Sequence, residues 1–102
     1  MKVVQIVPRG KTHLYGAIVK KEAAIRKNNR GTFVRAGRAT QSATKWSHRR
    51  YKGSISLAHG DDETVTARVR SASEEWQMLS AFLGWINRHF GDKVTAVNIT
   101  YS

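Results

Sequence analysis

Apolar side chains recur at every second position in two short stretches, residues 54–58 and 64–70. Such alternation is typical of strands with one buried face. In the second stretch, Thr66, Arg68 and Arg70 occupy the outward positions. The polar segment 59–63 between the stretches has the length of a hairpin turn. These patterns predict an antiparallel hairpin.

The segment that follows has helical spacing. Its apolar residues recur every three or four positions, which predicts an amphipathic helix over 72–90. They are Trp76, Leu79, Leu83, Ile86 and Phe90. Ser71 and Glu74 have the spacing of a capping box, in which each side chain satisfies a backbone amide of the other residue.

A second apolar row, Met78, Phe82 and Trp85, lies beside the first on this helix. Two interpretations remain open. Both rows belong to the core, or the second row is the interface of a homodimer, as in small basic proteins that use two copies to cover a site. The pattern slightly favours the dimer.

The N-terminal half is less regular. Residues 2–7 and 94–101 read as strands. Residues 17–29 contain good helix formers, but Asn28 to Gly31 could instead be a hairpin turn; the helix is slightly favoured. Residues 36–53 contain almost no aliphatic side chains, which predicts a basic and mobile segment.

Together these elements predict a single α+β domain over residues 1–102. We expect an antiparallel sheet of four or five strands, with the long C-terminal amphipathic helix packed on it and a second, shorter helix near 17–29. A chain of this length suits one domain.

The net charge of the chain and its distribution narrow the classes of function that the protein could have. The chain carries 18 Lys and Arg against 7 Asp and Glu, a net charge of +11. Residues 20–52 hold eleven of these cations and one acid, Glu22, so this third of the chain carries +10. Such a block opposes folding by self-repulsion, so a polyanionic partner is its natural explanation.

Residues 45–52 interleave aromatic and basic side chains. Cations neutralise phosphates, and exposed aromatic rings stack on unpaired bases. This pattern predicts binding of RNA or single-stranded DNA in preference to duplex. The alternative is that Trp46 and Tyr51 are buried at the edge of the core. The predicted nucleic-acid-binding residues are Lys20, Lys21, Arg26, Lys27, Arg30, Arg35, Arg38, Lys45, Trp46, Arg49, Arg50, Tyr51 and Lys52.

Motifs for nucleotide binding, metal binding or catalysis are weak in this sequence. Gly10-Lys11-Thr12 resembles the end of a phosphate-binding loop, but Gln5 stands where that motif needs a glycine. The four histidines lack the spacing of a helical metal site, and there is no cysteine. We therefore expect no enzyme, no metal and no cofactor.

No apolar run is long enough to span a bilayer, and no secretory signal is recognisable, so we expect a cytoplasmic protein without a membrane partner. The sequence favours a small basic nucleic-acid-binding protein. The alternative is a non-enzymatic interaction module that self-associates through its helix and binds an acidic protein.

Overall fold

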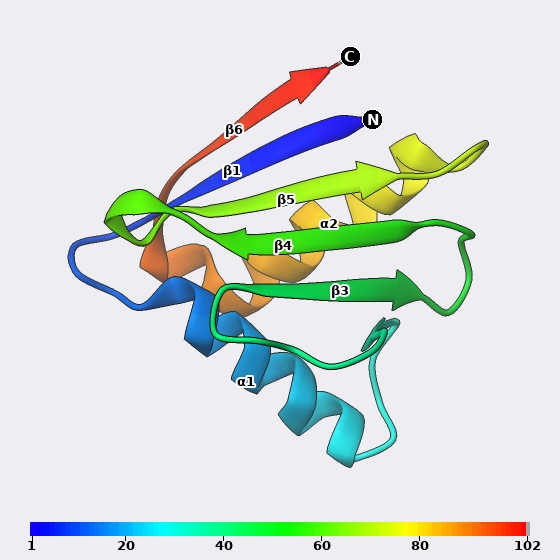
Figure 1. The fold of residues 1–102 in the computed structure, drawn as a ribbon, viewed down its shortest axis with the longest axis horizontal. Coiled ribbons are helices and arrows are strands. Elements are labelled where there is room, and N and C mark those ends of the chain that lie inside the picture. Colours follow the sequence, from blue (N-terminus) through cyan, green and yellow to red (C-terminus); the bar gives the residue numbers. More distant parts are fainter. Residues whose placement is uncertain (102) are drawn as a thin grey trace.

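A computed structural model describes residues 1–101 as one six-stranded antiparallel sheet with two helices packed on the same face (Figure 1). The sheet order is β2-β3-β4-β5-β1-β6, so the N-terminal strand lies between β5 and β6. The strands are β1 (Lys2–Pro8), β2 (Phe33–Arg35), β3 (Ala43–His48), β4 (Ser54–His59), β5 (Val65–Arg70) and β6 (Val94–Tyr101). The α+β prediction is confirmed, but the sheet has more strands than the predicted four or five.

The two helices are α1 (Leu14–Lys27) and α2 (Glu75–Phe90). The predicted helix near 17–29 is thus real and begins earlier, and β2 follows it. Helix α2 begins three residues later than predicted because only half of the capping box forms. The Glu74 amide donates to Ser71 Oγ at 2.9 Å, but the Glu74 carboxylate accepts from the Lys52 amide at 3.1 Å.

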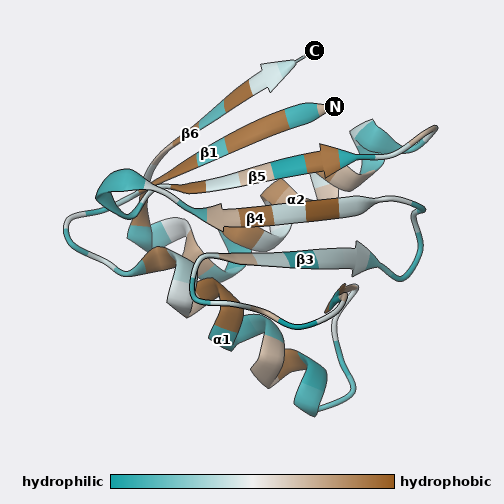
Figure 2. Ribbon diagram, viewed as in Figure 1, coloured by the Kyte–Doolittle hydropathy of each residue, from teal (hydrophilic) through white to brown (hydrophobic). Residues whose placement is uncertain are grey.

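Alternation along the strands buries one face of the sheet against the helices. Figure 2 shows hydrophobic and hydrophilic positions following one another along β1 and β6. Val4 of β1, Leu57 of β4 and Ala67 of β5 are all fully or almost fully buried. Their register places them side by side in one row under the helices.

The second apolar row of α2 belongs to this core. Met78 and Phe82 are fully buried and Trp85 is 4% exposed. The dimer interface predicted from these three residues is therefore wrong. The sheet is wider than expected, and Phe33 of β2 and Trp46 of β3 pack against this row, which a narrower sheet would leave open.

The segment 36–53 is not structureless. Residues Ala43–His48 form β3, which pairs with both β2 and β4. Thr44 and Trp46 face the core, whereas Lys45 and Ser47 face outward. The inward positions of this strand are Thr44, Trp46 and His48, and only one of them is apolar, so its period of two is easily overlooked.

No helix in the described part of the chain is long and apolar enough to cross a membrane.

Candidate functional site

The face of the sheet opposite the helices is open and basic. Lys45 on β3 is paired with Ser56 on β4, which is paired with Arg68 on β5. One step along, Ser54 is paired with Arg70. Lys45, Arg68 and Arg70 are exposed, and small side chains separate them. We call these three residues and Arg38 the sheet-face cations.

A shallow cavity of about 440 Å³ lies among the sheet-face cations. Arg38, from the loop before β3, lines it together with Lys45 and Arg68. Three hydroxyl-bearing residues, Thr40, Thr44 and Ser56, also line it. Cationic side chains around one hollow supply the donors that a phosphate group requires.

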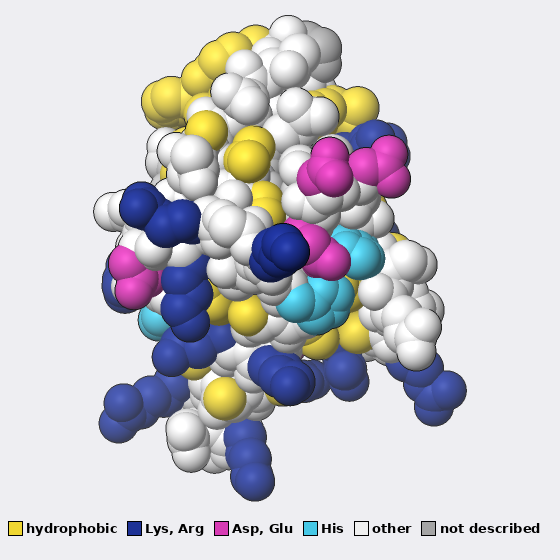
Figure 3. Space-filling model, turned by 90° about the vertical axis from the view of Figure 1, so that its left-hand side faces the viewer, with side chains coloured by type: hydrophobic (Ala, Val, Ile, Leu, Met, Phe, Trp, Pro, Cys, Tyr) yellow, Lys and Arg dark blue, Asp and Glu magenta, His cyan; other side chains and the backbone are white. Residues whose placement is uncertain are grey.

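Carboxylates are absent from this surface. None of the six described strands contains Asp or Glu. Glu22 is buried in α1, and the other acids lie in the β4–β5 turn, at the start of α2 and just after α2. Figure 3, viewed from one end of the sheet, shows most Lys and Arg in the lower part, whereas the acidic side chains lie in the upper and middle parts with some basic side chains beside them.

Several predicted binding residues lie elsewhere. Lys20, Lys21 and Lys27 are exposed on α1, which covers the opposite face of the sheet, and Arg30 is exposed in the loop after it. Arg26 is paired with Glu22 at 3.2 Å within the same helix. These cations contribute to the field of the molecule but do not join the sheet-face cations.

Arg35 makes its contacts within the protein. Its backbone amide donates to buried Glu22 at 3.4 Å, and its own Nε is buried without a hydrogen-bond partner among the described residues. Its inward position opposite Trp46 places it at the edge of the core. It is not exposed to a ligand in the way that was predicted.

The β3–β4 turn holds the remaining predicted binding residues, Arg49, Arg50, Tyr51 and Lys52. Arg49 Nε donates to the Gly31 carbonyl at 2.7 Å, which fixes that side chain. The Tyr51 ring stacks on His48, with centroids 4.6 Å apart, and the Arg50 guanidinium lies 5.8 Å from the Tyr51 ring. Lys52 is exposed. Burial, together with the charge of Arg50, lowers the pKa of His48.

Trp46 is 1% exposed and packs edge-on against Phe82 and Trp85, with ring centroids 6.2 and 5.0 Å away. The prediction that it stacks on a base is therefore corrected: its ring is a central part of the core. The alternative interpretation, that this aromatic is buried while the neighbouring cations face outward, describes the observed strand.

Arg68 and Arg70 were absent from the predicted binding residues. The alternation in residues 64–70 already assigned them outward positions. What the sequence did not reveal was that β5 lies two strands from β3, which brings Arg68 into the same row as Lys45.

A histidine–glutamate cluster lies at the end of the sheet shown in Figure 3. Glu63 Oε2, in the β4–β5 turn, lies 2.7 Å from His13 Nδ1 and 2.8 Å from His59 Nε2. The hydrogen bond with His13 is the main cause of a lowered pKa for the Glu63 carboxyl, which therefore stays ionised. Two imidazoles and a carboxylate are groups that can hold a metal ion, and their ligand atoms all lie within 4.8 Å of one another.

Comparison with known proteins adds no assignment: no protein-family model, no curated protein and no solved structure matches this chain significantly.

Proposed function

We propose that this protein binds nucleic acid through the open face of its sheet. The observation that supports the proposal is the row Lys45–Ser56–Arg68, extended by Arg38 and Arg70, on a sheet without a single carboxylate among the described strands. The net charge of +11 supplies a long-range attraction for any polyanion, and the sheet-face cations supply the contacts.

The mode of binding differs from the one that the sequence suggested. Phosphate contacts position a protein on nucleic acid but carry no sequence information by themselves. No Phe, Tyr or Trp ring of the six described strands occupies an outward position on the open face, because Phe33, Trp46 and Tyr101 lie on the helix side. We therefore expect binding driven by phosphates, with little dependence on sequence and no strong preference for single strands over duplex.

The experiment is a salt titration of binding to mixed-sequence oligonucleotides between about 50 and 200 mM salt. If the sheet-face cations contact four phosphates, the slope of log K against log salt is about −2.8 on a single strand and −3.6 on duplex. Substituting Lys45→Ala together with Arg68→Ala should reduce the magnitude of that slope by about 1.4 and 1.8, respectively, and weaken binding on every sequence.

The matched control removes the same charge from another surface. Arg88 and Lys93 are exposed near the end of α2, away from the sheet-face cations. The double substitution Arg88→Ala, Lys93→Ala should leave the slope nearly unchanged. If both double variants lost the same amount of binding, diffuse electrostatic attraction would explain the binding and the sheet-face cations would not be a specific site. Absence of binding at the lowest salt would refute nucleic-acid binding and favour the alternative of an acidic protein partner.

A further inference from the structure

His13 meets two residues of the distant β4–β5 hairpin, His59 and Glu63, at one point of the molecule. His13 precedes α1, His59 ends β4, and Glu63 lies in the turn before β5. Both imidazoles direct a nitrogen to the same oxygen, Glu63 Oε2, and their rings are nearly perpendicular, with centroids 5.2 Å apart. We propose that His13, His59 and Glu63 form a binding site for a divalent transition metal, and that zinc is the ion their donor atoms fit best.

The rings are held in orientation by the first turn of α1. Tyr15 stacks on His59, with centroids 5.9 Å apart, and its hydroxyl donates to the Thr40 carbonyl at 3.0 Å. The His13 ring lies over Gly16, where an added Cβ would stand 2.6 Å from His13 Cδ2. Tyr15 and Gly16 thus fix the orientation of the two imidazole rings before the ion binds. Residues that surround the ligands of a metal site have the same role.

The position of Glu63 supports the same assignment. Asp62 and Glu63 are consecutive residues in the left-handed region, with φ of 55° and 63°. Residues other than glycine adopt this conformation rarely, and at an energetic cost. The His13 side chain is 61% exposed, and exposed ion pairs contribute little to stability. The hydrogen bonds alone therefore explain this strained turn poorly.

Two imidazoles and one carboxylate are the ligand set of many catalytic zinc sites, which keep a fourth position open. Coordination requires that the facing nitrogen of each imidazole carry no proton, so the proton resides on the other ring nitrogen. A cavity of about 480 Å³ adjoins the cluster and is lined by both histidines, Tyr15, Thr40 and Lys20. The open position of the metal would face this cavity, where Lys20 favours an anionic ligand.

The test is a titration of the metal-stripped chain with zinc chloride by calorimetry. We expect one equivalent to bind with a Kd of about 1 µM or tighter, weaker than a four-ligand structural site. His13→Gln should weaken zinc binding at least about tenfold, the lower end of what is lost when even an outer partner is removed. Because His13 is largely exposed, this variant should stay folded.

His89→Gln is the matched control, since His89 packs against Trp85 on α2 and is not one of the three proposed ligands. It should bind zinc like the unsubstituted chain. Cobalt substitution gives a second readout, because three-protein-ligand tetrahedral cobalt absorbs strongly in the visible, and the band should disappear in Glu63→Gln. Failure to bind zinc below about 100 µM, or equal affinity in His13→Gln, would overturn the metal site; neither outcome bears on nucleic-acid binding.

Strand β6 forms an edge of the sheet. Proteins protect edge strands with charges, prolines or short length. The opposite edge, β2, has three residues and an arginine, but β6 has eight residues and none of them is charged or proline. We infer that β6 pairs with β6 of a second copy, in an antiparallel arrangement about a two-fold axis.

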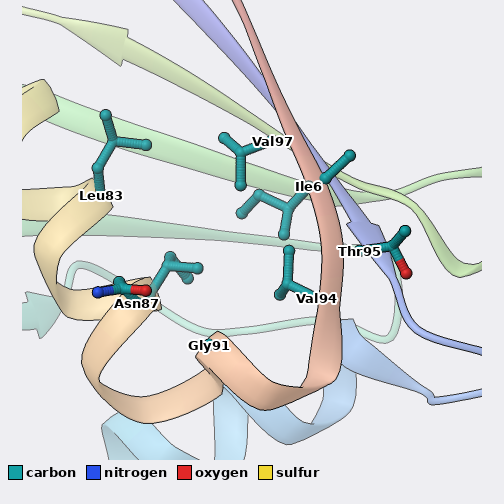
Figure 4. Close-up of a pocket in the computed structure, with 9 residues that line it drawn as sticks. Ile6, Leu83, Asn87, Gly91, Val94, Thr95 and Val97 are labelled. Carbon is teal, nitrogen blue, oxygen red and sulfur yellow. The ribbon is translucent and has the colours of Figure 1, made fainter.

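The helix-side face of β6 is only partly covered. Figure 4 shows Leu83 of α2 and Val94 and Val97 of β6 around a cavity of about 230 Å³ that α2 does not fill. Val97 is 38% exposed, and at the far end of the strand Tyr101 is 60% exposed. Trp76 of α2 is 59% exposed. Its neighbour Glu75 accepts a hydrogen bond from Lys2, and Lys2 is paired with Tyr101 in the sheet.

Charge and area favour a second copy as the occupant. Two chains of +11 can approach only where each surface is neutral, and β6 is neutral, with neighbouring Lys2 paired to Glu75. A stable interface needs about 800 Å² per partner. Trp76 and Tyr101 together expose roughly 200–300 Å², and an eight-residue edge about 27 Å long provides the rest.

Light scattering on a sizing column tests the dimer. We expect the unsubstituted chain to have twice its monomer mass, and Val97→Lys to be a folded monomer by circular dichroism. Ala24→Lys adds the same charge at an exposed position of α1 and should remain dimeric. A monomeric unsubstituted chain at about 1 mM, the Kd of very weak complexes, would overturn this inference, as would a dimeric Val97→Lys.

Discussion

Trp46→Ala should lower the free energy of unfolding by about 3–5 kcal/mol, because it removes a large buried ring and leaves a cavity. Trp46 touches aromatic side chains from both the sheet and α2, including Phe33 at 5.9 Å and Trp85 at 5.0 Å between ring centroids. Total stabilities of small domains are about 5–15 kcal/mol. The variant should therefore unfold at a much lower urea concentration.

Trp76→Ala is the matched control. Trp76 is 59% exposed on α2, so in the monomer the same truncation should change stability by no more than about 0.5 kcal/mol. Urea unfolding followed by circular dichroism measures both variants, at a protein concentration low enough to keep the chain monomeric. If Trp46→Ala were as stable as Trp76→Ala, the buried position of Trp46 in β3 would be wrong, and an exposed stacking role would again be tenable.

The two tryptophans show how far the sequence pattern reaches. Trp76 belongs to the regular apolar stripe of α2 and was expected to face the core. Instead it lies at the first turn of the helix and is exposed. Trp46 lies in a segment of small and basic residues and was expected to face solvent, but it fills the centre of the core. Periodicity identifies a helix reliably, whereas which end of it is covered depends on where the sheet lies.

The elements with strong local signals were predicted well. The strands near 54–58 and 64–70, the C-terminal helix and the terminal strands all follow from periodicity and turn residues. Strand β3 was missed because its inward positions, Thr44 and Trp46, do not form an apolar run. Consequently the width of the sheet, and with it the burial of Met78, Phe82 and Trp85, could not be predicted.

The candidate sites depend on pairings between distant segments. Lys45 and Arg68 share a row only because β4 lies between their strands, and no local pattern encodes that neighbourhood. His13 and His59 lie 46 positions apart and meet only because the start of α1 packs against the end of β4. Spacing rules for metal ligands detect sites within one helix or hairpin, so they reach His59 and Glu63 of the β4–β5 hairpin but not His13.

Gly53→Ala should be the most damaging of the glycine-to-alanine substitutions in the described chain. Gly53, just before β4, has φ of +140°, a conformation that side-chain-bearing residues rarely adopt. An added Cβ would lie within 3 Å of three atoms: the Arg70 carbonyl oxygen, Met78 Sδ and Ser71 Cβ. The backbone oxygen cannot move away without breaking the β4–β5 pairing that begins at Ser54 and Arg70. Overpacking and backbone strain together should cost roughly 2–5 kcal/mol.

Gly84→Ala provides the opposite outcome from the same chemical change. Gly84 lies within α2, and an added Cβ there meets no atom within 4 Å. Alanine restricts the unfolded chain and fits the helix, so stability should rise by about 0.5–1 kcal/mol. In thermal unfolding, Gly53→Ala should lower Tm by at least about 10 °C, and Gly84→Ala should raise it by a few degrees. A Gly53→Ala variant with unchanged Tm would mean that the β3–β4 turn adopts a different backbone path, and that Arg70 is not held against it.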